Sequence, residues 1–242
     1  MTDSTPESPA ITEAPKTRKV QQRTIAGKAR IIDAAAELFI RHGYRGTSVN
    51  DIIAESGTSK NFFYARFPEG KKDVAAVISH ESTWDGLQTQ RLMTQEMIDI
   101  GLILAHRVKM WKESPLILAA LKLSFEFGAE EEYGSAWRDW VAFNTGQIAE
   151  AQKRGEIRPH IVPEQQARQL PGFWAGLILT GGVLDRSYDH VEEYVLVAYQ
   201  NFMKAVAVPE IMPDLVWAVD RGEKLYTEFL RKEEETQGSA AV

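Results

Sequence analysis

The chain has 242 residues, 44% of them hydrophobic, and a formal net charge of −6. This length allows one large domain or two small ones with a substantial core. The absence of cysteine excludes disulfide bridges and thiolate metal sites. No apolar stretch approaches the roughly 20 residues of a membrane span, and the N-terminus lacks the apolar core of a signal peptide. We therefore expect a soluble, cytoplasmic protein that does not enter membranes.

The charge is divided unevenly along the chain. Residues 16–72 carry 12 Lys and Arg against five acids, a net +7, whereas residues 73–242 carry 16 against 26, a net −10. Residues 1–15 add three acids and no base. This asymmetry favours a basic module that faces a polyanion, joined to an acidic body that faces something else.

Apolar residues recur at helical spacing along most of the chain, and no alternating run is long enough to indicate a strand. The predicted fold class is therefore all-α. Residues 1–20 are rich in Ser, Thr, Pro and Glu and become basic at their end, and residues 236–242 are small and polar. Both segments are predicted to be disordered tails.

The first predicted helix begins near Thr24, which can cap it, and ends before Gly43. Two short helices separated by a glycine turn follow, which is the helix-turn-helix pattern. Their predicted limits are Thr47 or Ser48 to about Ser56, a turn at Gly57, and Ser59 to a point before Pro68.

The remaining helices are placed from periodicity, with Pro and Gly marking the loops between them. Pro171 either kinks its helix or delays the start of that helix. The predicted helices run from Lys71 or Asp73 past Trp84, then near 93–111, 115–127, 135–153, 164–185, 189–206 and 212–233.

The segment 31–73 carries a series of ordered motifs. A first helix ends in Gly43-Tyr44, Thr47-Ser48-Val49 opens the second helix, and the turn IIAESGTSK (52–60) precedes FFYARF (62–67) and a lysine pair. This segment resembles the DNA-binding domain of the TetR family of repressors. The resemblance implies a three-helix reader at 21–72 and a larger helical-bundle domain for ligand binding and dimerisation at 73–235.

The second short helix is the expected recognition helix. Such a helix enters the major groove, about 12 Å wide, and presents its N-terminal side chains to base edges. Ser59, Lys60 and Asn61 occupy that end and are our candidates for base contacts. The resemblance implies that Tyr64 and Arg66 bind phosphate, although the family commonly has His at the position of Arg66.

Further phosphate contacts are expected where the neighbouring helices begin. Thr47 and Ser48 open the helix that crosses the DNA backbone, where hydroxyl and free N–H groups suit phosphate. Lys71 or Lys72 adds a contact at the next helix start. The turn 68–72 is one residue longer than the usual family turn, so the sequence leaves open which lysine takes this role.

Three short motifs in the body point to a subgroup of the family. They are a Trp-x-x-Trp pair (Trp137 and Trp140), GEIRP (155–159) and GLILTG (176–181). These motifs resemble the γ-butyrolactone receptors that control secondary metabolism in actinomycetes. The resemblance implies a small-molecule effector such as a butyrolactone or a furan-like autoregulator.

The resemblance also implies which residues hold the effector. Trp137 and Thr180 match positions that line the pocket, where an aromatic wall closes an apolar cavity and a few polar groups orient the ligand. Thr180 can donate a hydrogen bond to a carbonyl. Trp84 is a third candidate, because it ends the helix that leads from the reader. Trp140 at helical spacing is equally well explained as a core residue.

A homodimer is expected, joined through the helices near 164–185 and 189–206, which are rich in small and apolar residues. Two-fold symmetry would place two recognition helices about 34–36 Å apart, or a multiple of this, on a pseudopalindromic operator of double-stranded DNA. An effector that prefers the dimer state with the wrong reader spacing would release the DNA. We therefore predict a ligand-released repressor, associated with the nucleoid when bound to DNA.

An enzyme is not indicated. The five His residues are scattered without metal-ligand spacing, and neither a phosphate-binding glycine loop nor a Gly-x-Ser-x-Gly elbow is present. Glu130, Glu131 and Glu132 form a charge run that we interpret as a solvated loop. We expect no catalytic residues, metal or cofactor.

Two alternatives keep the fold and change the role. The first is a pseudo-receptor that binds DNA and responds to an antibiotic or a biosynthetic intermediate. The second is a partner-binding protein whose reader no longer recognises DNA. Steep loss of DNA binding with added salt would argue against the second, because neutralised phosphates release counterions.

Overall fold

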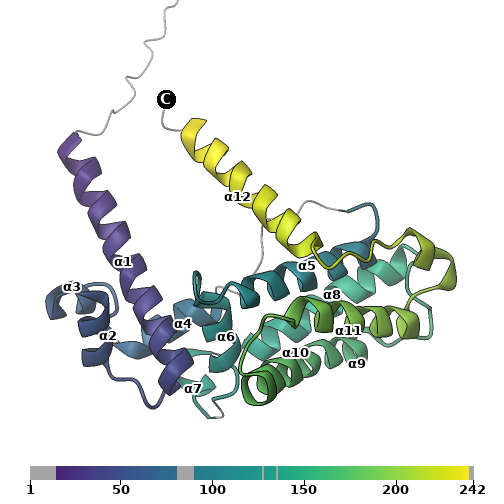
Figure 1. Cartoon of the computed structure of the whole chain (residues 1–242), viewed down its shortest axis with the longest axis horizontal. Coiled ribbons are helices and arrows are strands. Elements are labelled where there is room, and N and C mark those ends of the chain that lie inside the picture. The colour runs from purple at the N-terminus through teal and green to yellow at the C-terminus, as the bar shows by residue number, and fades with distance from the viewer. Residues whose placement is uncertain (1–14, 81–89, 127, 135, 240–242) are drawn as a thin grey trace, which may run out of the picture.

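The computed structural model describes residues 15–80, 90–126, 128–134 and 136–239 (Figure 1). The structure is 74% helical. No strand forms within these ranges, although a one-residue antiparallel bridge joins Ile157 to Ala207. The predicted all-α class is confirmed.

The helices follow one another with short connections. They are α1 (Pro15–His42), α2 (Val49–Ser56), α3 (Lys60–Tyr64), α4 (Lys71–His80), α5 (Met93–Lys109), α6 (Leu116–Leu123), α7 (Glu130–Tyr133), α8 (Ala136–Lys153), α9 (Pro163–Ala167), α10 (Gln169–Thr180), the π turn η1 (Gly181–Asp185), α11 (Val191–Val206), the 3-10 turn η2 (Pro209–Asp214) and α12 (Arg221–Ser239).

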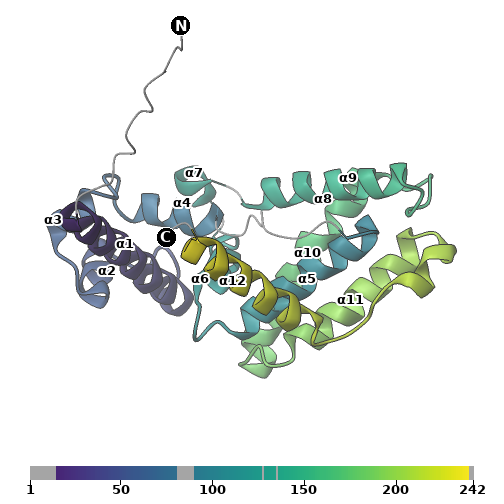
Figure 2. The same ribbon diagram turned by 90° about the horizontal axis from the view of Figure 1, so that it is seen from above.

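The molecule is elongated, with α3 at one extremity and α9 and α11 at the other (Figures 1 and 2). A hydrophobic cluster among α1–α4 takes in Leu123 of α6 and Tyr133 of α7. A larger cluster fills the space between α5, α8, α10 and α11 and takes in Leu118 and Leu121 of α6. Helix α6 therefore packs against both ends of the molecule. The domain limits at 72/73 and 235/236 stay predictions.

The first helix begins earlier than predicted. It starts at Pro15 instead of near Thr24, so residues 15–20 of the predicted tail are helical. Proline is tolerated in the first turn of a helix, and the following Lys, Arg and Gln residues favour helix. The prediction for residues 1–14 lies outside the described residues, and so does the predicted continuation of α4 past Trp84.

The C-terminal helix was also placed wrongly. Residues near 212 form η2, which contains Pro213, and α12 runs from Arg221 to Ser239 instead of 212–233. Part of the predicted 236–242 tail is thus helical. Pro213 lies inside η2, and the backbone at Leu215 is extended, so the regular helix begins only at Arg221. Ion pairs between Glu228 and Lys232 and between Arg231 and Glu235 support its last turns.

Two further segments differ from the sequence expectation. The predicted helix 164–185 is divided into α9, α10 and η1, and α10 begins at Gln169, so Pro171 lies in its first turn and delays the helix start. The acidic run that we interpreted as a loop is the short helix α7. Tyr133 packs in the shared cluster beside α4, whereas Glu131 and Glu132 are exposed, so the run is solvated as expected but helical.

Helix α5 is the scaffold of the body, and two buried carboxylates fasten distant segments to it. Asp99, fully buried, binds the guanidinium of Arg221 on α12 through both oxygens, at 2.5 and 2.8 Å. Glu156, 4% exposed, accepts hydrogen bonds from the amides of Met93 and Thr94 at the start of α5. A carboxylate at a helix N-terminus satisfies free N–H groups and complements the helix dipole.

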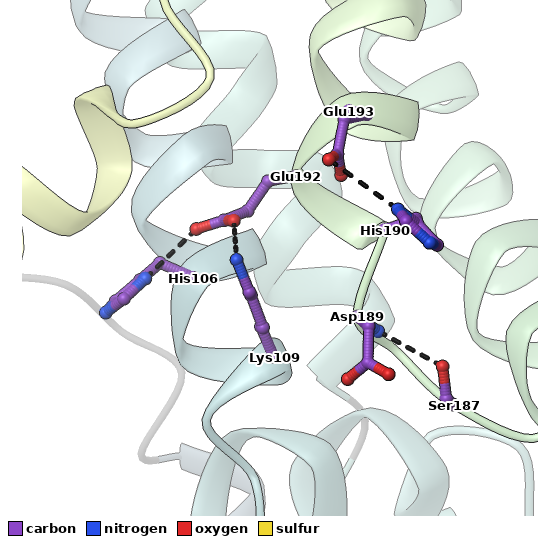
Figure 3. Close-up of polar contacts among 7 residues, drawn as sticks. All are labelled: His106, Lys109, Ser187, Asp189, His190, Glu192 and Glu193. Atoms are coloured by element: carbon purple, nitrogen blue, oxygen red, sulfur yellow. Dashed lines mark hydrogen bonds and ion pairs between the residues drawn. The ribbon is translucent and has the colours of Figure 1, made fainter.

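A third buried carboxylate joins α5 to α11 (Figure 3). Glu192 lies 3.0 Å from Nδ1 of His106 and 2.6 Å from Nζ of Lys109. Burial disfavours the charged carboxylate, but the hydrogen bonds from His106 and Lys109 prevail and hold the pKa of Glu192 below its ordinary value. The neighbouring Glu193 is exposed and pairs with His190 at 3.6 Å.

Because the pKa of Glu192 is lower in the folded state, its contribution to stability is complete above about pH 4.5 and is lost as the pH falls through the folded value. We expect Glu192→Gln to cost about 2–4 kcal/mol at pH 7, since it removes one partner of a buried pair. That cost should shrink below about pH 4.5.

Urea unfolding of the wild type and the variant at one protein concentration, from pH 7 to pH 3.5, measures this. Glu193→Gln is the matched control, with a change within about 0.5 kcal/mol. A cost for Glu192→Gln that stays constant over this pH range would contradict the assignment.

Candidate DNA-binding surface and effector site

The two short helices are both capped at their N-termini, and the cap of α2 is reciprocal. The Ser48 hydroxyl accepts from the amide of Asp51 at 3.2 Å, and the Asp51 carboxylate accepts from the amide of Ser48 at 2.9 Å. Hydrogen bonds from Ser48 hold the pKa of Asp51 below its ordinary value. Helix α2 ends at Gly57, whose φ of 61° is left-handed, and Ser59 caps α3 through the amide of Phe62. These local signals fix the angle between α2 and α3.

Aromatic packing decides which side of α3 is exposed. Phe63 and Phe67 are buried, as expected for core residues. Ser59, Lys60 and Asn61 are exposed at the N-terminal end of α3. The structure therefore brings the three predicted base-contacting residues together on solvent-facing surface at the extremity of the molecule (Figure 1).

A pocket of about 830 Å³ opens between the α1–α2 turn and the α3–α4 turn. It combines cationic and hydroxyl side chains, the groups that bind phosphate oxygens. Tyr64, one of these, is 40% exposed. The polar side chains that line the pocket are Arg45, Thr47, Ser48, Tyr64, Glu69, Lys71, Lys72 and Glu132.

The two lysines of the α3–α4 turn have different surroundings. Lys71 donates to the carbonyl oxygens of Tyr44 and Thr47, at 2.7 and 2.9 Å, and its Nζ lies 4.3 Å from the centre of the Tyr44 ring. Lys72 is partly exposed and pairs with Glu69 at 3.1 Å. Lys71 is therefore engaged in holding the α1–α2 turn, whereas Lys72 is the more accessible cation.

Two other predicted phosphate ligands are also engaged within the protein. Thr47 is 2% exposed, and its hydroxyl donates to the carbonyl of Gly43 at 2.9 Å. The guanidinium of Arg66 lies 3.4 Å from the centre of the Phe62 ring and donates to the Phe62 carbonyl at 2.9 Å. Their contacts with DNA stay predictions, and both side chains would have to leave these partners to extend toward phosphate.

The predicted effector residue Trp137 lies in an aromatic cluster at the start of α8. Its ring centre is 5.7 Å from that of Phe125 and 5.6 Å from that of Trp140. The indole N–H donates to the carbonyl of Ser124, just after α6. The cluster provides an apolar aromatic wall of the kind that small hydrophobic ligands contact.

Among the described residues, Thr180 makes its hydrogen bonds away from this cluster. Thr180 is exposed at the end of α10, and its hydroxyl donates to the carbonyl of Gly176 at 2.8 Å. Thr180 and Trp137 thus have separate contacts in this structure. Trp84 lies outside the described residues. The effector roles of all three stay predictions.

Helices α10 and α11 and the turn between them expose large apolar side chains. Leu179 is 55% exposed, Val183 73%, Leu184 75% and Val197 54%, so this face is far more apolar than an ordinary solvated helix surface. These are the segments from which a dimer interface was expected. Within the described ranges, no helix is long and apolar enough to span a bilayer, and no cluster of His, Asp or Glu could hold a metal ion.

Known proteins similar to this chain are bacterial regulators. Residues 31–78 match the model of the bacterial regulatory proteins of the tetR family. The chain is 21% identical to the A-factor receptor protein of Streptomyces griseus over 192 residues, 79% of this chain and 68% of that protein. The structure of full-length TylP, a TetR regulator from Streptomyces fradiae, superposes with a TM-score of 0.75 and 26% identity, covering 87% of this chain and 98% of TylP.

The segment 31–78 thus matches the TetR-family model, and the chain as a whole is similar to TetR regulators. Its fold also resembles a gamma-butyrolactone receptor structure, with a TM-score of 0.64 and 19% identity over 85% of this chain and 99% of that one. The resemblance stated from the sequence is confirmed at both levels, a TetR-family DNA-binding regulator similar to butyrolactone receptors.

Sequence reasoning missed two features of this TetR reader. Arg45 lines the same pocket as Tyr64 and Lys72, and its place between two turn residues could have marked it as a phosphate ligand. Tyr44 was noted only as a motif residue, although it is buried and its hydroxyl donates to Glu132 of α7. No local pattern connects positions 88 residues apart.

The contrast between the lysines gives a prediction for this TetR reader. Lys72→Ala should leave the free energy of unfolding within about 0.5 kcal/mol of wild type, because its exposed ion pair is weak. It should lower operator affinity and reduce the salt slope of binding by about 1. Lys71→Ala should instead destabilise the fold by about 2–3 kcal/mol, since two carbonyls lose a cationic donor. Urea unfolding and salt-dependent DNA titrations of both variants test this, and the reverse pattern would contradict it.

Proposed function

We propose that this TetR-family regulator is a dimeric repressor that leaves a pseudopalindromic operator when a small hydrophobic signal binds its body. The observation that carries the proposal is the solvent-facing N-terminal end of α3, flanked by a pocket of cations and hydroxyls. The N-terminal end of α3 would contact base edges, and the pocket would contact phosphates. These two kinds of contact are the components of operator recognition.

The exposure of the side chains supports a division of roles. We assign Ser59, Lys60 and Asn61 to base edges in the major groove, where Asn favours adenine and Lys favours guanine. Tyr64 and Lys72, which line the pocket and are exposed or partly exposed, are assigned to phosphate, together with Ser48 and Arg45.

The apolar face of α10, η1 and α11 supports a homodimer. Val183 and Leu184 are about three-quarters exposed in the single chain, at 73% and 75%. Burying such side chains against a second copy is favourable by about 25 cal/mol per Å² of apolar surface. A two-fold axis through this face makes the contact self-complementary and requires a symmetric DNA site.

The aromatic cluster around Trp137 supports a hydrophobic effector. Phe125, Trp137 and Trp140 offer apolar contact area, and the likeness to the A-factor receptor and to a gamma-butyrolactone receptor favours a butyrolactone or furan-like signal. On this basis we propose control of secondary metabolism. A pseudo-receptor that responds to an antibiotic or an intermediate has the same reader and differs only in the effector.

A gel shift on DNA that flanks the protein's own gene, with and without extract of the producing organism, tests the proposal. We expect a retarded band that the extract abolishes. Asn61→Ala should weaken the band by about 1–3 kcal/mol in binding free energy. At protein concentrations adjusted to give equal retardation, the extract should release Trp137→Ala less than it releases the wild type. Purified butyrolactone and antibiotic fractions of the extract separate the two effector classes.

A band that no extract or fraction changes would contradict release by a small molecule. Absence of binding to flanking DNA and to a selected DNA pool at low salt would contradict the reader itself. Glu234→Ala, which removes an exposed carboxylate of α12, serves as the control variant with unchanged binding.

A further inference from the structure

The turn between α1 and α2 is held by the body as well as by the reader. Gly43 has a φ of 71°, and a Cβ built there would lie 2.5 Å from Oε1 of Glu126, which follows α6. The same Oε1 accepts a hydrogen bond from the amide of Tyr44 at 2.8 Å. The left-handed glycine therefore permits the Glu126 carboxylate to reach the backbone of the turn.

A second carboxylate of the body reaches the same residue. The Tyr44 hydroxyl donates to Oε2 of Glu132 at 2.5 Å, and its ring packs on Tyr133 with centres 4.9 Å apart. Burial, followed by the Glu132 carboxylate, raises the pKa of Tyr44, so the phenol keeps the proton it donates. Tyr133 in turn donates to the carbonyl of Leu123 in α6 at 2.8 Å.

On the reader side, Tyr44 is tied to the starts of α2 and α4. Lys71 bridges the carbonyls of Tyr44 and Thr47, at 2.7 and 2.9 Å, one residue before the Ser48 cap of α2. On the body side, Trp137 donates to the carbonyl of Ser124, two residues before Glu126. A continuous series of contacts thus runs from the aromatic cluster to the first turn of α2.

We propose that Glu126 and Glu132 are positioning residues that couple the aromatic cluster around Trp137 to the orientation of the reading helices. Their carboxylates hold the Gly43–Tyr44 turn, and the turn sets where α2 and α4 begin. A ligand that displaces Trp137 moves the Ser124–Glu126 segment, and the turn follows. The use of this coupling in DNA release depends on the proposed function, but the coupling itself exists in the free protein and is measurable without DNA.

A double-mutant cycle in the free, full-length protein tests the coupling. Trp137→Phe keeps an aromatic ring and removes the N–H donor to Ser124. Glu126→Ala removes the acceptor of the Tyr44 amide, and Glu132→Ala removes the acceptor of the Tyr44 hydroxyl. Amide hydrogen exchange from Thr47 to Ile53 is the readout. We expect each variant alone to accelerate this exchange about three- to tenfold, as the loss of one typical hydrogen bond predicts.

The double variant carries the decisive result. Because the contacts from Ser124 reach the turn through Glu126, Trp137→Phe should add little in the Glu126→Ala background, so the two effects are not additive. Additive effects, or no effect of Trp137→Phe on α2 exchange, would overturn the proposal. Urea unfolding of each variant shows whether the change is confined to the turn.

Three further variants separate positioning from general effects. Glu131→Ala removes the neighbouring exposed carboxylate of α7 and should leave α2 exchange unchanged. Tyr44→Phe should reproduce Glu132→Ala, and Glu132→Gln, which keeps an acceptor oxygen, should restore most of the protection. Failure of that rescue, or an equal effect of Glu131→Ala, would contradict a role through Tyr44.

A second experiment measures affinity for operator DNA obtained by selection, and this experiment depends on the proposed function. Glu132→Ala should lower operator affinity about fivefold or more relative to Glu131→Ala, although both remove one negative charge. If the wild type selects no operator, the proposed function fails, and the exchange cycle still decides the coupling. If the wild type binds and the two variants bind alike, positioning by Glu132 is contradicted.

Discussion

The structure depends most on the short turn at Gly43 and Tyr44, where four helices are brought together. Tyr44 is buried between Phe39 and Tyr133, so one ring fills space that belongs to both the reader and α7. Lys71 binds its carbonyl and thereby places the start of α4. With this turn in place, the caps at Ser48 and Ser59 set the two reading helices, and the N-terminal end of α3 faces solvent.

In the body, buried carboxylates join distant segments to one central helix, α5. Helix α5 is fastened by Asp99 to α12, by Glu156 to the segment after α8, and by Glu192 to α11. Removing any one carboxylate leaves a buried donor unpaired, which makes these ties specific as well as stabilising. At Gly222 a Cβ would lie 2.2 Å from the Leu102 carbonyl oxygen, so α12 lies directly on the α5 backbone.

The local parts of the fold could be predicted from the sequence, and the long-range parts could not. Ser48, Gly57 and Ser59 are cap and turn residues that act within three positions, and their helices form as predicted. The predicted starts of α1 and α12 were wrong. Pro15 begins a helix, whereas Pro213 lies in the 3-10 turn before one, and a proline in the sequence is compatible with either position.

For the DNA-binding site, too, local features could be predicted from the sequence and long-range contacts could not. Exposure of Lys60 and Asn61 follows from the aromatic face of α3, but the engagement of Lys71 depends on a turn 24 residues away. Likewise, Glu132 belongs to an acidic run without periodicity, and only the tertiary fold brings it to Tyr44.

The central claim is that two readers of a symmetric dimer recognise one DNA site. Selection of binding sequences from a random duplex pool by the full-length protein measures this directly. The structure predicts enrichment of an inverted repeat whose half-site centres are about 34–36 Å apart, or a multiple of this distance, with binding that falls steeply as salt is added. Enrichment of a single unrepeated half-site, or no enrichment at low salt, would contradict it.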